Sequence, residues 1–139
     1  MPILLDTVTV SELRRSESRM HPGVWTWQQG IGEAFISVIT LNELRYGLRK
    51  VEPRDPVFAA HLTAWYAQIL AHPQKFRILD VDRGIAEQAA DLRAEHDTPF
   101  EDSLIAATAK VHNLTLATRN TADFEACGID LVNPWECVA

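Results

Sequence analysis

Short apolar runs alternate with stretches of helical periodicity along the chain. Runs rich in β-branched residues are typical of buried strands, and apolar positions spaced three and four apart are typical of amphipathic helices. Strands are expected at residues 3–6, 34–39, 77–82, 114–118 and 130–132, and helices at residues 9–15, 21–30, 41–50, 57–71, 85–95 and 98–112. This alternation predicts an α/β fold, in which helices flank a central, mostly parallel sheet of about five short strands.

The length and composition fit one globular domain over residues 1–139, with 47% hydrophobic and 23% charged residues. No apolar run approaches the roughly 20 residues of a membrane helix. The N-terminal segment also lacks the basic and apolar regions of a signal peptide. Cys127 and Cys137 form no CxxC pair or ligand cluster. We therefore expect a cytoplasmic protein with ordinary thiols and no membrane partner.

The net charge of −6 argues against a protein that holds nucleic acid by overall electrostatic attraction. Local basic groups can still contact RNA, and two such groups follow the first two predicted strands. The candidate RNA contacts are Arg14, Arg15, Arg45 and Arg49, with Arg19 and Lys50 beside them. For each of these side chains the alternative is a solvated position on a helix surface.

Acidic residues follow the predicted strands at several places. Asp6 ends the first strand, and Glu43 follows the second. Asp102 lies at the start of an apolar helix, and Asp123 follows the fourth strand. Because the carboxyl ends of parallel strands converge on one crevice, we expect these four side chains to lie close together. Clustered carboxylates repel one another unless a cation such as Mg²⁺ neutralises them, so the sequence indicates a metal-dependent phosphodiesterase, most plausibly a nuclease.

Helix capping offers a structural interpretation of some of these acids. Thr40 and Glu43 have the spacing of a capping box, in which the glutamate reaches back to the backbone of the cap residue. Thr98 and Glu101 have the same spacing, with proline between them at the first helical position. That pattern assigns Glu101 to capping and leaves Asp102 free to point elsewhere.

The remaining acids differ in how well a structural role explains them. Asp123 fits the start of a short helix, whereas Asp6, at the end of an apolar strand, is costly to bury without a partner. Asp80 and Asp82 also follow a strand, but alternation points them to opposite faces, so we set them aside as metal ligands. No HExxH or GxSxG pattern is present, which leaves zinc-hydrolase and serine-hydrolase mechanisms without support.

Five segments of the chain carry a more specific signal. They are Leu4-Leu5-Asp6-Thr7, residues 37–47, residues 102–109, residues 116–124 and the closing Val132-Asn133-Pro134-Trp135-Glu136. In this order they resemble the PIN domain over essentially the whole chain, and in particular the VapC-type toxins of bacterial toxin–antitoxin pairs.

The resemblance implies an endoribonuclease that depends on Mg²⁺ or Mn²⁺, forms a homodimer and is held inactive by a small antitoxin. Its metal-binding and catalytic acids match Asp6, Glu43, Asp102 and Asp123, with Thr7, Thr118 and Asn120 in supporting positions. Metal-activated water would then cleave the RNA phosphodiester. Trp25, Trp27 and Leu48 are candidate contacts for a helical part of the antitoxin, with burial in the core as the alternative.

The chain departs from the family pattern at two places. Val8 stands where the family usually has asparagine, and residues 92–99 look shorter than the usual connection before Asp102. A second hypothesis is therefore a catalytically degenerate PIN domain that binds an antitoxin and cuts nothing. A third is a DNA-directed nuclease with the same acids, since nothing in the sequence reads the 2′-hydroxyl group.

Overall fold

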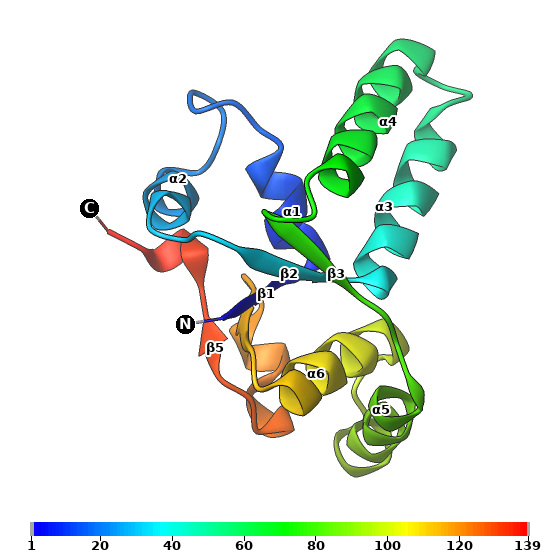
Figure 1. Ribbon diagram of the computed structural model, residues 1–139, viewed down its shortest axis with the longest axis vertical. Helices are drawn as coiled ribbons and strands as arrows, with labels where there is room; N and C mark the ends of the chain where they lie inside the picture. The colour runs from blue at the N-terminus through cyan, green and yellow to red at the C-terminus, as the bar shows by residue number, and fades with distance from the viewer. Residues whose placement is uncertain (1, 139) are drawn as a thin grey trace.

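The computed structural model describes residues 2–138 and confirms the α/β architecture (Figure 1). Its strands are β1 (Ile3–Leu5), β2 (Ala34–Ser37), β3 (Phe76–Leu79), β4 (Thr115–Ala117) and β5 (Leu131–Val132). The α-helices are α1 (Thr7–Leu13), α2 (Pro22–Gln29), α3 (Val38–Val51), α4 (Pro56–Ala71), α5 (Arg83–His96) and α6 (Phe100–His112). Three short 3-10 helices follow, η1 (Thr121–Asp123), η2 (Glu125–Cys127) and η3 (Pro134–Glu136). None of the helices in the described residues is long and apolar enough to cross a membrane.

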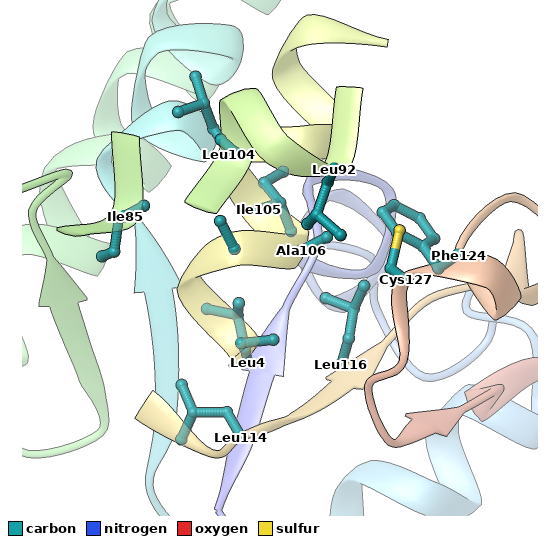
Figure 2. Close-up of a cluster of buried hydrophobic side chains, with 13 residues drawn as sticks. Leu4, Ile85, Leu92, Leu104, Ile105, Ala106, Leu114, Leu116, Phe124 and Cys127 are labelled. Atoms are coloured by element: carbon teal, nitrogen blue, oxygen red, sulfur yellow. The ribbon is translucent and has the colours of Figure 1, made fainter. Parts of the chain in front are cut away.

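The five strands form one sheet in the order β3-β2-β1-β4-β5, and every neighbouring pair is parallel. Side chains alternate between its faces, so each face packs against different helices. Leu4 and Leu116 join α5 and α6 in one core that includes Leu92 (Figure 2). Ile3 and Leu5 belong to the second core, which lies against α1, α3 and α4 on the opposite side of the sheet (Figure 1). The sheet is therefore covered on both faces, as the sequence predicted.

The junction of β2 and α3 differs from the prediction. The helix begins at Val38 rather than near Leu41, and its cap is Ser37, whose hydroxyl accepts a hydrogen bond from the Ile39 N–H at 3.0 Å. Thr40 is thus the third helical residue, and its side chain is fully buried. The capping box predicted for Thr40 and Glu43 is wrong, which leaves Glu43 free for another role.

The start of α6 also corrects the prediction. The helix begins at Phe100 after Pro99, and no side chain forms a capping hydrogen bond there. The capping box predicted for Thr98 and Glu101 is therefore wrong. Residues 97–99 form a tight link after α5, in which Asp97 has the left-handed φ of 53°.

Three other helices begin with an aspartate as cap: Asp6 at α1, Asp55 at α4 and Asp82 at α5. The Asp6 carboxylate accepts a hydrogen bond from the Thr9 N–H at 2.8 Å, so α1 starts earlier than predicted. The Asp82 carboxylate accepts one from the Ile85 N–H at 2.9 Å at the start of α5. β3 ends at Leu79, before the aspartates that the prediction included in this strand. Capping by aspartate is worth about 1 kcal/mol per helix.

One backbone carbonyl joins the ends of β1 and β4. The Ala117 oxygen accepts a hydrogen bond from the Asp6 N–H at 3.2 Å and another from the Thr9 hydroxyl at 2.9 Å. Both donors belong to the start of α1, whereas the acceptor is the last residue of β4. The carboxyl ends of the two central strands are therefore fixed relative to each other.

Candidate active site

The carboxyl edge of the sheet gathers acidic side chains from four parts of the chain. Asp6 follows β1, Glu43 lies on α3, Asp102 lies in the first turn of α6, and Asp123 closes η1. Asp6 is buried, Glu43 and Asp102 are half-buried, and Asp123 is exposed. The four predicted acids thus follow the carboxyl edge of one sheet, with Asp6 the most buried and Asp123 exposed, and this group of acids is called the acidic pocket below.

Burial is the largest cause that raises the pKa of Glu43 above its usual value of 4.5. The negative charges of Glu101, Asp102 and Asp6 raise it further. A hydrogen bond from Thr7 acts in the opposite direction, because it stabilises the charged carboxylate. Carboxylates from the β1–α1 junction and from the first turn of α6 therefore act on Glu43.

The same causes act on Asp102. Burial raises the pKa of Asp102 above its usual value of 3.8, and the charges of Asp123, Asp6 and Glu101 raise it further. Asp123 is thus within electrostatic reach of Asp102, although its own side chain is exposed. No cationic side chain contributes to the shift of either acid.

The hydroxyl groups of Thr7 and Thr40 support Glu43. The Thr7 hydroxyl lies 2.7 Å from Glu43 Oε1 and 3.1 Å from Thr40 Oγ1. A hydroxyl has one hydrogen, and a carboxylate attracts it more strongly than a second hydroxyl does. The Thr40 hydroxyl, which is fully buried, can then donate its own hydrogen to Thr7. This chain of contacts fixes the orientation of the Glu43 carboxylate.

Thr118 and Asn120 shape the loop that carries the fourth acid. The fully buried Thr118 hydroxyl accepts a hydrogen bond from the Asn120 N–H at 3.1 Å, and the Thr118 N–H donates to the Val132 carbonyl. Asn120 is exposed. In this structure Thr118 supports the turn that leads from β4 to Asp123.

Two residues of the acidic pocket have roles that differ from those predicted from the sequence. Thr40 was interpreted as a helix cap, but it contacts Thr7 inside the pocket. Glu101 was interpreted as a capping glutamate, but its charge acts on both Glu43 and Asp102. Its position directly before Asp102 was the one signal in the sequence that could have suggested this.

The predicted RNA contacts are exposed, and they differ in what they contact. Arg15 lies 3.5 Å from Glu12, and Arg49 lies 3.9 Å from Glu52, so both are occupied by weak surface ion pairs. Arg45 is exposed on α3. The Arg14 guanidinium lies 5.5 Å from the centre of the Phe58 ring and lines a groove next to the pocket.

That groove has a volume of about 290 Å³ and lies between α1, α3 and α4. Thr7 and Glu43 line it where it meets the acidic pocket. Its other walls are mainly apolar and include Leu44, Leu48, Val51, Phe58, Leu62 and Trp65. Leu48, one predicted antitoxin contact, thus lines this groove, whereas Trp25 and Trp27 lie half-buried on α2.

The donors of the pocket are chemically suited to a hard divalent cation, because they are carboxylate and hydroxyl oxygens. Within residues 2–138, however, no group of three Asp, Glu, His or Cys side chains is already arranged to hold a metal ion. Mutual repulsion of the carboxylates opposes their closer approach, and a cation would remove it. The residues therefore fit Mg²⁺ or Mn²⁺ in the chemistry of their oxygen donors.

A small α/β domain with carboxylates at the carboxyl edge of its parallel sheet is the architecture of a family of nuclease domains. The profile of the PIN domain matches residues 3–128, so this chain belongs to the PIN-domain family. The resemblance to VapC-type toxins is also confirmed. "VapC ribonuclease Y4jK" of Sinorhizobium fredii is 37% identical and aligns over 96% of this chain and 98% of its own length.

Solved structures agree with this assignment. The structure of FitAcB from Neisseria gonorrhoeae is 32% identical, with a TM-score of 0.80, and covers 96% of this chain and 99% of its own. A toxin–antitoxin complex from Klebsiella pneumoniae is 30% identical, with a TM-score of 0.71, and covers 96% of this chain and 98% of its own. The fold, the family and the full-length similarity thus agree.

Proposed function

We propose that this protein is a Mg²⁺- or Mn²⁺-dependent endoribonuclease, formed by one PIN domain over residues 1–139 and acting in the cytoplasm as the toxin of a VapBC-type pair. The observation that carries the proposal is the position of acids from separate elements at the carboxyl edge of one parallel sheet, where Asp6 follows β1, Glu43 lies on α3 and Asp102 lies in the first turn of α6. A relative with the name of a VapC ribonuclease supports RNA as the substrate.

Asp6, Glu43, Asp102 and Asp123 would hold the metal. When bound, the ion activates water and neutralises negative charge on the phosphodiester. Thr7 keeps the Glu43 carboxylate oriented toward the pocket through its 2.7 Å hydrogen bond. Because the pKa values of Glu43 and Asp102 are raised, metal binding must displace any proton that these acids hold, so metal affinity is expected to rise with pH.

The test is cleavage of single-stranded RNA by the purified protein. We expect cleavage with Mg²⁺ or Mn²⁺ and none in excess EDTA. Asp102→Asn and Asp6→Asn should each lower the rate by at least about 100-fold, since each removes a negatively charged ligand. Asp80→Asn is the matched control, because Asp80 is an exposed acid that follows β3. Equal cleavage in EDTA would exclude the metal mechanism.

A second candidate is a catalytically degenerate PIN domain that only binds an antitoxin. Two observations favour it: Val8 replaces the usual polar residue, and the pocket acids of the described chain form no ready-made metal group. Val8 is 45% exposed in the first turn of α1. If a polar side chain there orients the metal ligands, Val8→Asn should raise turnover. An unchanged rate in an active wild type would show that Val8 is harmless.

The proposed partners are a second copy of the chain and a small antitoxin. The relative from Klebsiella pneumoniae was solved as a toxin–antitoxin complex. The apolar groove between α1, α3 and α4 suits an amphipathic helix, and its opening at Glu43 would let an arginine of the antitoxin pair with the acids. Co-expression with the neighbouring small reading frame, followed by size exclusion, tests this. Separate elution at micromolar concentration would count against the antitoxin assignment.

A further inference from the structure

An arginine and a tryptophan outside the acidic pocket lie at the same edge of the sheet. Arg119 follows β4 and Trp135 follows β5, and these parallel strands are neighbours in the sheet. Arg119 also lies in the loop between Thr118 and Asp123, which carries the fourth acid. Because the carboxyl ends of parallel strands share one edge, the pair lies at the same edge of the sheet as the carboxylates.

The pair is held in a defined geometry. The Arg119 guanidinium carbon lies 5.5 Å from the centre of the Trp135 ring. Asn133 connects the two residues, because its amide donates to the Arg119 carbonyl at 3.4 Å and its side-chain oxygen accepts from the Trp135 N–H at 2.9 Å. A Cβ at Gly23 would lie 2.6 Å from the Trp135 carbonyl, so α2 packs directly against this turn. Trp135 is therefore a fixed support for the guanidinium.

The charge of Arg119 is available to a ligand. Its side chain is exposed, and no ion pair joins it to an acid in the part of the chain that the structure describes. It also does not contribute to the pKa shifts of Glu43 and Asp102, so its charge is not used to neutralise the pocket. Arg77, which lies 6.0 Å from the Phe35 ring, differs in having a Glu33 partner at 3.4 Å.

A protein of net charge −6 whose pocket is lined by carboxylates repels the backbone of RNA. We propose that Arg119, oriented by Trp135, binds a phosphate of the RNA strand beside the phosphodiester that is cut. A guanidinium that rests on an aromatic ring keeps its N–H groups directed outward, where they can bind two phosphate oxygens. Arg119 is then a substrate-binding residue and Trp135 a positioning residue. The inference rests on the proposed ribonuclease function.

The test measures binding and cleavage separately. Binding of a fluorescent single-stranded RNA oligonucleotide is measured in EDTA over a range of salt concentrations, and cleavage is measured with Mn²⁺. Arg119→Ala should weaken binding about tenfold and lower the slope of log K against log salt by about 0.7, the value for one phosphate contact to a single strand. It should raise KM and leave kcat nearly unchanged, because the phosphate that Arg119 binds does not react and is held equally in the ground state and in the transition state.

Three variants distinguish the proposed role from a structural one. Arg119→Lys should keep the salt slope but bind a few-fold more weakly, because a lysine lacks the planar fork. Trp135→Phe should retain the affinity that Trp135→Leu loses, since only the former keeps an aromatic support. Arg77→Ala is the matched control, because this arginine also lies over a ring but is ion-paired, and it should bind RNA as the wild type does.

The outcomes separate this inference from the proposed function. If the wild type cuts RNA but Arg119→Ala binds with unchanged affinity and salt slope, the inference is wrong and the ribonuclease assignment stands. If no metal supports cleavage but Arg119→Ala still weakens RNA binding, the inference stands without the activity. If Arg77→Ala loses as much RNA affinity as Arg119→Ala does, only the net charge of the protein matters and the inference is wrong. The inference is also wrong if Arg119→Ala weakens binding of the antitoxin and leaves binding of RNA unchanged, because Arg119 would then belong to the antitoxin interface.

Discussion

The starts of α1 and α6 each contribute an aspartate to the pocket, but they use it differently. Asp6 caps α1, and its carboxylate accepts a hydrogen bond from the Thr9 N–H at 2.8 Å. Asp102 lies inside the first turn of α6, which has no side-chain cap. At a helix start the macrodipole favours a charged carboxylate by about 0.3–1 kcal/mol. Burial and the negative charges of the neighbouring acids act in the opposite direction and raise the pKa of Asp102.

The comparison shows that the two aspartates combine a structural role and a role in the site differently. Asp6 has both roles, since it caps α1 and its charge acts on the other acids. At α6 the helix forms without help from Asp102, because the rest of its length is anchored in the core by buried residues such as Ile105 and Ala106. Asp102, like Glu43, therefore keeps its charge at a cost to the folded state.

The largest effect that sharpens this comparison concerns the hydroxyl support, which only the α1 start provides. Thr7→Val removes the hydrogen bond to Glu43, so Mn²⁺ affinity or activity should fall about 10- to 100-fold. Thr40→Val should have a smaller effect in the same direction, while Thr40→Ser keeps the hydroxyl and should restore it. Calorimetric titration with Mn²⁺ measures the affinity. Full Mn²⁺ affinity and activity in Thr7→Val would mean that Glu43 needs no orientation.

A smaller effect concerns the free energy of unfolding, measured with urea in metal-free buffer. Asp6→Asn and Asp6→Ala both remove the charge, but only asparagine can still cap α1. The alanine variant should therefore be less stable than the asparagine variant by about 1 kcal/mol. At position 102 the same two variants should differ by much less, because no capping bond is lost there. A similar difference at both positions would refute the division of roles.

The smallest effect is a dependence on pH. The folded pKa of Asp102 is raised, so the folded state binds its proton more tightly than the unfolded chain does. The resulting stability is present below the unfolded pKa, near 3.8, and is lost as pH rises through the folded pKa. In metal-free buffer Asp102→Asn should thus gain stability relative to wild type between about pH 4 and pH 7. A constant difference across this range would exclude the predicted linkage.

The sequence predicted the order of strands and helices, because apolar runs and helical periodicity were read directly from it. It also predicted that Asp6, Glu43, Asp102 and Asp123 lie at the carboxyl edge of the sheet, and their role as metal ligands stays a prediction. It did not predict where α3 begins. Val38 and Ile39 are β-branched and were assigned to the strand, but β2 ends at the edge of the sheet and the Ser37 hydroxyl starts the helix there.

The support of Glu43 could not be read from the sequence either. Thr7 and Thr40 belong to different helices, and their contact depends on how α1 and α3 pack against the same face of the sheet. The local spacing of Thr40 and Glu43 suggested a cap because capping is a local pattern. In the structure Thr40 and Glu43 instead contact Thr7, which lies on another helix. The capping box predicted for Glu101 does not form either.

The two hydrogen bonds that end on the Ala117 carbonyl have a consequence for synthesis of the chain. The start of α1 leaves the ribosome early, but its acceptor in β4 is made only after Asp102 and the whole of α6. β1 cannot complete its pairing until then, because β4 is one of its two neighbours in the sheet. A nascent chain that ends before β4 thus lacks Asp123, and it also lacks the Ala117 carbonyl that accepts the hydrogen bond of the Asp6 N–H. If the domain is a toxin, the ribosome that makes it carries no working copy until β4 and η1 have been made.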